Sequence, residues 1–432
     1  MPVTVVTAAA PTTGTLPVSQ SFTSSALGTQ VPKLVIVEAT RATSVGPVST
    51  GGMFAMGAWD GTNVHSCVAG SGDAQAVGAL HNASHRDSTT KIIQILTVGS
   101  TAIDGEADPV SLDAGGFTMS WTDLCATGIQ LKVTMVWGDD WEAFVGSYVG
   151  STSNNGVVSP AVPFPARGLI FFGVRDTAGS GAGADGIFNL GFAALNEDGT
   201  VQGQAGHPYF EANTPAINTA CGSGVRNDSA VQRIIVDGVT EALTEECRHE
   251  VTAGGATSFD VTTRVAGGFA LTSHFIALRN GSKRTWVGVP TLGMTTTGDK
   301  TVTPGFPPGV IWGIPNVLDT INAYASSGLC ANFGLAVSCP DGTIKGCTMS
   351  SEDGVATSDT YCATSSNFAG LGVTGGADWV ATVTARGATT FTFNVSNAAS
   401  LDVLTPFLVF EEPKDPGWWS ALRRWRRQLA RM

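Results

Sequence analysis

The chain of 432 residues has little charge and no long apolar run. Only 13% of its residues are Asp, Glu, Lys or Arg, about half of the share that is typical of soluble domains. Nowhere do 18 apolar residues follow one another, so the sequence predicts no membrane-spanning helix. The first 20 residues have no basic start and no apolar core before a cleavage site, so they lack the pattern of a signal peptide.

Motifs of catalysis and cofactor binding are also missing. The sequence has no Gly-x-x-x-x-Gly-Lys phosphate loop, no dinucleotide-binding strand–loop–helix fingerprint and no Gly-x-Ser-x-Gly nucleophile turn. Its eight cysteines form no Cys-x-x-Cys pair and no zinc pattern with its six histidines. We therefore expect no enzyme and no cofactor, and we favour free, buried thiols. Cys339 and Cys347 are the best candidates if a disulfide forms.

One acidic stretch offers oxygen ligands of the kind that Ca²⁺ prefers. It runs from Asp104 to Asp108 with Glu106 between them. Its spacing lacks the full pattern of an EF-hand loop, so a solvated turn is favoured and no metal is predicted.

An apolar segment recurs three times, each time after proline. The copies are residues 33–37, 168–172 and 309–312. Short apolar runs that are rich in β-branched and aromatic residues and bounded by Pro and Gly are typical of buried strands. A second apolar segment follows each copy and ends in Asp-Gly-Thr, at residues 60–62, 198–200 and 341–343. Asp-Gly between apolar segments predicts a β-hairpin with a type I′ turn.

These recurrences divide the chain into three tandem modules of about 130 to 140 residues, an ordinary size for one domain. We expect module 1, with an N-terminal arm, in residues 1–155, module 2 in 156–290 and module 3 in 291–413. Gly, Thr, Ser and Val are abundant, and the charged residues that favour helices are scarce. The predicted fold class is all-β: three tandem, jelly-roll-like β-sandwich modules followed by a short C-terminal amphipathic helix.

A polar string recurs in part before an apolar segment in modules 1 and 2. It reads Ser-His-Arg-Asp-Ser at residues 84–88 and Val-Arg-Asn-Asp-Ser at residues 225–229. Arg and Asp that fix a turn through local hydrogen bonds are the favoured interpretation. A contact loop is the alternative.

The C-terminal segment, residues 414–432, differs from everything before it. Residues 415–432 carry five Arg against one acidic residue, although the whole chain has a net charge of −12. Trp and Leu recur there at helical spacing, which predicts a basic amphipathic helix that needs a partner to be stable. An anionic membrane and packaged nucleic acid are alternative partners, although the acidic body argues against specific nucleic-acid binding. The predicted partner-docking residues are Trp418, Trp419, Leu422, Arg423, Arg424, Trp425, Arg426, Arg427, Leu429 and Arg431.

The modules also resemble a β-sandwich module of virion proteins from tailed bacteriophages. The resemblance lies in Phe-Pro and the strand after it (164–172), the segment with the Asp-Gly-Thr hairpin (191–200), the Gly-Gly-Phe strand (115–117) and the loop at 351–360. The third copy departs from the pattern because it lacks the strand that residues 91–96 supply in the first. The resemblance implies a structural role in a virion, with host-surface binding as a further role. It supplies no catalytic residues.

We therefore expect a bacteriophage virion structural protein of the tail or an appendage, assembled in the host cytoplasm. Its partners would be other virion proteins and further copies of itself. The alternatives are a capsid decoration protein and a carbohydrate-binding adhesin. In an adhesin, Trp59, Trp121, Trp137 or Trp286 would stack on a host-surface glycan. Because these residues lie in strand-like segments, core positions are favoured over sugar binding.

Overall fold

A computed structural model describes residues 3–75, 83–97, 100–175, 182–213, 219–237, 240, 242–268, 270–281, 284–325, 330–353, 355–372, 376–399 and 402–412. Antiparallel strands and turns make up this part of the chain, and no helix occurs in it. The predicted all-β class is therefore confirmed. The helix predicted at 414–432 lies outside the described residues. No helix within them is long and apolar enough to cross a membrane.

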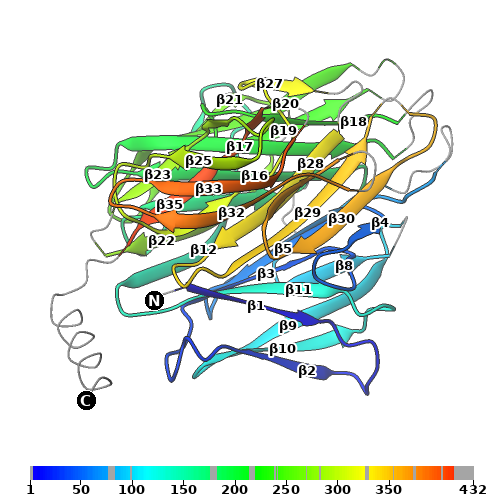
Figure 1. Cartoon of the computed structure of the whole chain (residues 1–432), viewed down its shortest axis with the longest axis horizontal. Coiled ribbons are helices and arrows are strands. Elements are labelled where there is room, and N and C mark those ends of the chain that lie inside the picture. Colours follow the sequence, from blue (N-terminus) through cyan, green and yellow to red (C-terminus); the bar gives the residue numbers. More distant parts are fainter. Residues whose placement is uncertain are drawn as a thin grey trace.

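Each module is a sandwich of a large and a small sheet, and the three modules share one strand order (Figure 1). The large sheet of module 1 has the order β1 (Val3–Ala9), β11 (Gln130–Val136), β3 (Leu34–Ala39), β5 (Met53–Trp59), β6 (Val64–Gly70), β7 (Ser84–Ser88). Its small sheet has the order β2 (Val18–Thr23), β10 (Gly116–Asp123), β9 (Ile103–Asp113), β8 (Ile93–Leu96).

Module 2 repeats this order. Its large sheet contains β12 (Trp141–Val149), β22 (Thr272–Asn280), β14 (Gly168–Gly173), β16 (Gly186–Leu195), β17 (Val201–Glu211), β18 (Cys221–Val225). Its small sheet contains β13 (Val157–Val158), β21 (Phe259–Val265), β20 (Leu243–Gly254), β19 (Val231–Val236).

Module 3 repeats the order again and adds the short pair β24 (Thr291–Leu292) and β34 (Val403–Leu404). Its large sheet contains β23 (Thr285–Gly288), β35 (Phe407–Glu411), β26 (Pro308–Gly313), β28 (Cys330–Ser338), β29 (Ile344–Glu352), β30 (Thr360–Ser365). Its small sheet contains β25 (Gly298–Val302), β33 (Phe391–Asn397), β32 (Ala377–Arg386), β31 (Phe368–Leu371). Strand β31 occupies the place of β8, so the expectation that the third copy lacks this strand is wrong.

The recurring apolar segments are the strands β3, β14 and β26, as predicted, and both of their faces are buried. In β3, Leu34 and Ile36 face a core that all three modules share, whereas Val35 and Val37 face the core inside the module 1 sandwich. Since successive side chains of a strand point to opposite faces, a strand covered on both sides needs an uninterrupted apolar run. The shared core therefore explains why these segments do not alternate with polar residues.

The Asp-Gly-Thr hairpins form as predicted, but their turns are not of type I′. Within these turns, only the glycines Gly61, Gly199 and Gly342 have positive φ, at 93°, 82° and 89°. A type I′ turn needs positive φ at both central residues. In each turn the aspartate accepts a hydrogen bond from the backbone N–H two residues later, at 2.8, 3.0 and 2.8 Å. The sequence pattern thus selects an Asx turn followed by a left-handed glycine.

Two strands precede the module boundaries expected at residues 155 and 290, but each belongs to the sheet of the module that follows. Strand β12 pairs with β22 of module 2, and β23 pairs with β35 of module 3. In terms of strand pairing, module 2 begins between Val136 and Trp141, and module 3 begins between Asn280 and Thr285.

Each module gives one short strand to another module. Strand β15 (Ala182–Ala184) of module 2 pairs with β7 of module 1, and β27 (Ala323–Ala325) of module 3 pairs with β18 of module 2. Strand β4 (Val48–Thr50) of module 1 pairs with β30 of module 3, which closes the cycle. Figure 1 shows β27 in yellow among the green strands of module 2 and β4 in blue beside β30. We call β4, β15 and β27 the exchanged strands.

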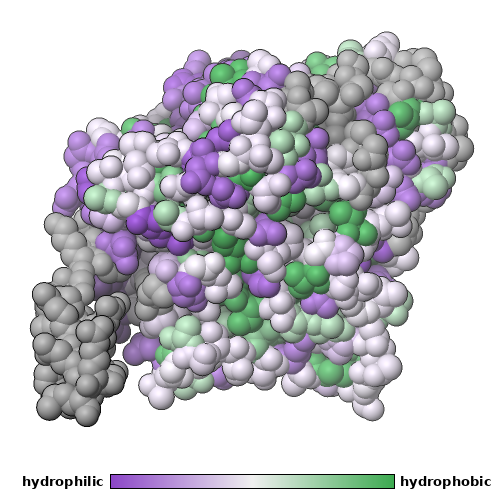
Figure 2. Space-filling view, in the orientation of Figure 1, coloured by the Kyte–Doolittle hydropathy of each residue, from purple (hydrophilic) through white to green (hydrophobic). Residues whose placement is uncertain are grey.

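The three modules are therefore related by a pseudo-threefold arrangement within one chain. Their large sheets face the shared core, and each small sheet covers the other side of its own large sheet. On the face drawn in Figure 2, apolar side chains form small, separated patches among polar ones.

Candidate functional site at the junctions between modules

An aromatic triad marks the centre of the shared core. Phe54, Phe188 and Phe333 occupy the same position in β5, β16 and β28 and are fully buried. Their ring centroids are 5.3, 5.3 and 5.0 Å apart, in edge-to-face and tilted arrangements that aromatic rings prefer. One ring from each module thus contacts the rings of both other modules.

Buried polar contacts join module 1 to its two neighbours. At the junction with module 3, Lys132 forms an ion pair with Glu38, and its Nζ donates to the carbonyl oxygen of Leu335 at 3.0 Å. Burial raises the pKa of Glu38 although the adjacent ammonium group opposes this. At the junction with module 2, Asp60 accepts a hydrogen bond from the backbone N–H of Val145 at 2.8 Å.

Modules 2 and 3 are joined in a similar way. Tyr209 and Ser351 both hydrogen-bond to the buried carboxylate of Glu211, and their hydroxyl oxygens are 2.7 Å apart. His207 also contacts the backbone carbonyl of Asn332 through its Nε2. These partners come from different modules, so each junction has its own set of specific contacts.

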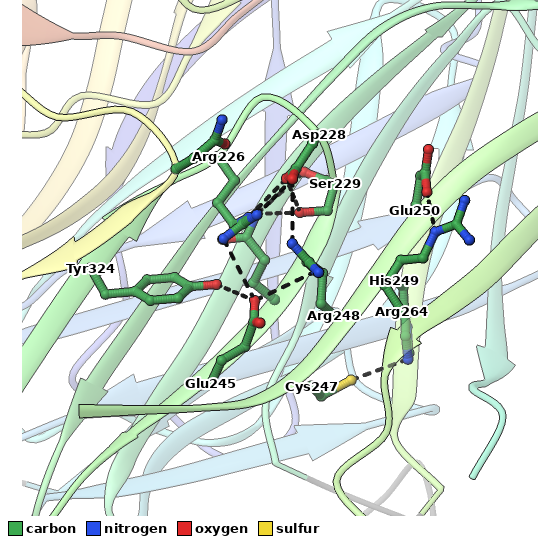
Figure 3. A network of polar contacts seen from close by, with 12 residues as sticks. Arg226, Asp228, Ser229, Glu245, Cys247, Arg248, His249, Glu250, Arg264 and Tyr324 are labelled. Atoms are coloured by element: carbon green, nitrogen blue, oxygen red, sulfur yellow. Dashed lines mark hydrogen bonds and ion pairs between the residues drawn. The ribbon is translucent and has the colours of Figure 1, made fainter. Parts of the chain in front are cut away.

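The polar string of module 2 fixes a turn and also holds an exchanged strand. Two guanidinium nitrogens of Arg226 donate to the carboxylate of Asp228, at 2.8 and 2.6 Å, and this pairing lowers the pKa of Asp228. In Figure 3, Asp228 lies between Arg226 and Arg248, and Tyr324 of β27 points toward Glu245. The guanidinium carbon of Arg226 is 5.9 Å from the centroid of the Tyr324 ring.

The corresponding string of module 1 forms β7, which pairs with β15 in the same sheet. The ring nitrogens of His85 contact the carbonyl oxygens of Asp185 and Arg175, at 2.8 and 3.1 Å, both from module 2. Asp87 lies 3.5 Å from the ring of His274, which is again in module 2. The turn-fixing interpretation therefore holds for residues 225–229 but is wrong for residues 84–88, which form a strand. The strings of both modules make contacts within the molecule, to the neighbouring module.

Cys247, His249 and Tyr148 form a buried cluster in module 2 whose composition suggests nucleophilic chemistry. The thiol lies 3.1 Å from His249 Nε2, and the Tyr148 hydroxyl lies 2.9 Å from His249 Nδ1. Burial raises the pKa of the Cys247 thiol to about 12 and lowers the pKa of His249 to about 4. At neutral pH the thiol stays protonated, so it lacks the thiolate that a cysteine nucleophile requires.

Cys247 is one of seven cysteines whose side chains are described, and all seven are buried. No disulfide joins Cys339 to Cys347.

The acidic stretch of module 1 is bound by protein groups. Lys91 Nζ lies 3.1 Å from Glu106 and 2.9 Å from Asp108, while Asp104 accepts a hydrogen bond from the backbone N–H of Ala126 at 3.1 Å. Among the residues that the structure describes, no three His, Cys, Asp or Glu side chains are placed to hold a metal ion.

The tryptophans proposed for sugar stacking have different environments. Trp59 and Trp121 are buried, as expected for core residues, and Trp137 is partly buried against the core of module 1. Trp286 is partly buried and lines a groove between modules 2 and 3. The predicted partner-docking residues from Trp418 to Arg431 lie outside the described residues.

No family model matches the chain, and no curated protein shows significant similarity to its sequence.

Proposed function

We propose that the chain is a structural protein of a tailed-bacteriophage virion, in the tail or an appendage. The observation that supports this most is the cyclic exchange of β4, β15 and β27. Three sandwiches joined only by linkers would move independently, because interfaces between domains of one chain are usually small and polar. Exchanged strands and a shared apolar core instead make one rigid body, which suits a protein that bears load within a particle.

The resemblance of the repeated module to virion modules supports the same proposal. In this proposal, other virion proteins and further copies of the chain are its partners. Residues 414–432 are then the attachment segment, with their Trp and Leu residues docked on a neighbour and their arginines on its acidic surface.

Antibody labelling of virions tests the proposal. Antibodies raised against the purified chain are added to virions of its phage and located by electron microscopy. Label on the tail or an appendage is the expected result, and unlabelled particles would contradict it. Label on the capsid shell would instead favour a decoration protein, for which the pseudo-threefold body is a suitable shape at a threefold position.

Truncation tests the attachment segment separately. A chain that ends at residue 413 should remain folded by circular dichroism but fail to join particles that lack the protein. If the truncated chain joins them as well as the full chain does, the modules make the contacts and the attachment role of residues 414–432 is wrong.

A further inference from the structure

A groove runs along the junction of modules 2 and 3. One hollow of about 320 Å³ lies between the two modules. A second hollow of the same volume adjoins it and is lined by module 2 alone, and the two share Arg167, Asn196 and Glu197 in their walls. Each hollow is within the size range of small-molecule sites, about 300 to 1,000 Å³. Module 2 supplies one wall through the β16–β17 hairpin, and module 3 supplies the other through β23 and the loop before β26.

Trp286 gives this groove a larger aromatic wall than the equivalent residue gives at either of the other two junctions. Strand pairing places Val287 opposite Leu408, Val145 opposite Ile276 and Val5 opposite Thr134. The residues just before these valines are therefore equivalent: they are Trp286, Phe144 and Thr4. The pseudo-threefold repetition thus breaks here, where the largest aromatic side chain lines a hollow.

Two amide side chains in the groove are anchored at one end only. Gln202 Oε1 accepts the backbone N–H of Val287 at 2.7 Å, and Asn196 Nδ2 donates to Thr200 Oγ1 at 3.0 Å. In the described part of the chain, Gln202 Nε2 and Asn196 Oδ1 have no partner. The groove therefore offers one fixed donor and one fixed acceptor to a ligand.

The charges of the groove nearly cancel. Arg284 binds the carboxylate of Glu411 with two nitrogens, at 3.2 and 3.0 Å, and its guanidinium lies 5.0 Å from the Phe306 ring. Arg167 is buried and donates to the carbonyl oxygen of Asn196, and the acidic residues Glu197 and Asp198 line the same hollows. An anionic ligand would meet no uncompensated positive charge.

We propose that this groove binds a neutral saccharide, with one sugar ring stacked on Trp286 and hydroxyl groups bonded to Gln202 and Asn196. A sugar ring has an apolar face that can stack on the indole. Its hydroxyl groups both donate and accept hydrogen bonds, so the same ligand can bond to the free amide donor and to the free amide acceptor. A purely apolar ligand would displace water from the two amide groups without replacing its hydrogen bonds, which costs free energy. This inference does not depend on the proposed place in a virion.

Saturation-transfer NMR on the full chain with chitotriose, cellotriose and maltotriose tests the proposal. We expect at least one trisaccharide to bind, and Trp286→Ala to weaken its affinity about tenfold or more, since stacking and the lost anchor together amount to roughly 1.4 kcal/mol. Phe144→Ala, the equivalent aromatic truncation at the other junction, is the matched control and should leave affinity unchanged. Absence of binding to all three sugars, or equal loss in both variants, would overturn the proposal.

A second variant keeps the test decisive if Trp286→Ala does not fold. Gln202→Glu retains an acceptor for the Val287 N–H but replaces the free amide donor with a carboxylate oxygen. We expect it to weaken binding several-fold while leaving the unfolding midpoint almost unchanged. Unaltered affinity in this variant would show that the sugar binds elsewhere.

Discussion

At the scale of single residues, one buried ion pair projects into the core that the modules share. Lys132 and Glu38 are opposite each other in β11 and β3 and are almost completely buried. The equivalent pairs in modules 2 and 3 are His274 with Phe172 and Pro406 with Ile314. An apolar residue thus occupies the Glu38 position in both other modules, so the fold does not require a charge there.

Lys132→Met should destabilise the protein strongly. It leaves the Glu38 carboxylate without its cation in an apolar core, a change that typically costs about 3 to 5 kcal/mol. Adding Glu38→Leu should recover most of this loss, because the position then resembles Phe172 and Ile314. Chemical denaturation of the single and double variants measures both effects. A double variant that is no more stable than Lys132→Met would contradict this explanation.

Buried imidazoles should make the protein sensitive to mild acid. Burial lowers the pKa of His207 and His249 to about 4, and burial with repulsion from His274 lowers that of His65 to about 3. The unfolded chain protonates these groups near pH 6.5, whereas the folded chain does not. The contribution of these imidazoles to the free energy of unfolding is therefore fully present above pH 6.5. Below pH 6.5 it decreases by about 1.4 kcal/mol per pH unit for each imidazole.

Denaturant unfolding at pH 7, 6 and 5 measures this loss, in a range where most carboxylates stay ionised. The variant His207→Gln should show a shallower dependence on pH than the unchanged chain. Because burial also raises the pKa of Glu38 and Glu211, which has the opposite effect on the pH dependence, the comparison with the variant is decisive. The same pH dependence in His207→Gln and in the unchanged chain would mean that the fold does not keep His207 neutral.

At the scale of elements, the exchanged strands cover edges that would otherwise be open. Without β4, strand β30 would expose unpaired backbone groups at the end of a seven-stranded sheet. Replacing residues 48–50 by Gly-Gly-Gly should speed amide exchange in β30 and lower the thermal midpoint, because glycine disfavours strand structure. The matched control replaces the exposed residues 13–15 by Gly-Gly-Gly. If β30 exchanges at the same rate in both variants, the pairing of β4 with β30 is not stable in solution.

The sequence reveals the long strands but not the exchanged ones. Apolar runs such as 168–172 identify central strands. A strand that is buried on both faces has an uninterrupted apolar run, and turns and prolines mark where this run begins and ends. The exchanged strands are three residues long, and Ala182–Ala184 has neither periodicity nor β-branched residues. Their partners lie in other modules, so no local signal reveals them. The polar strings at 84–88 and 225–229 lie beside their docking sites, but their contacts need the three-dimensional arrangement to be recognised.

The groove between modules 2 and 3 could not be recognised from the sequence either. Trp286 is one of four tryptophans that the sequence offers for sugar stacking, and its sequence context favours a core position. Only the packing of β23 against the β16–β17 hairpin brings it together with Gln202 and Asn196. A pattern confined to one segment could not single it out.

At the scale of the whole molecule, the shared core and the closed cycle of exchanged strands should make folding a single event. Each module contributes a phenylalanine to the central triad and one strand to a neighbouring sheet. Removing one module would expose the core, open the edge of the one sheet that its exchanged strand covers, and leave the exchanged strand that it receives without a partner. The modules should therefore unfold together, although each is large enough to be an independent domain.

Hydrogen exchange across a guanidinium chloride series tests most directly whether the three modules unfold together. It compares the unchanged chain with the variant Phe333→Ala. Phenylalanine truncation in a core costs about 3 to 5 kcal/mol, and Phe333 belongs to module 3. If the three modules form one body, peptides from β3, β14 and β26 share one midpoint and shift together in the variant. If only module 3 shifts while modules 1 and 2 keep their midpoint, the modules are independent domains and the interlocked body is wrong.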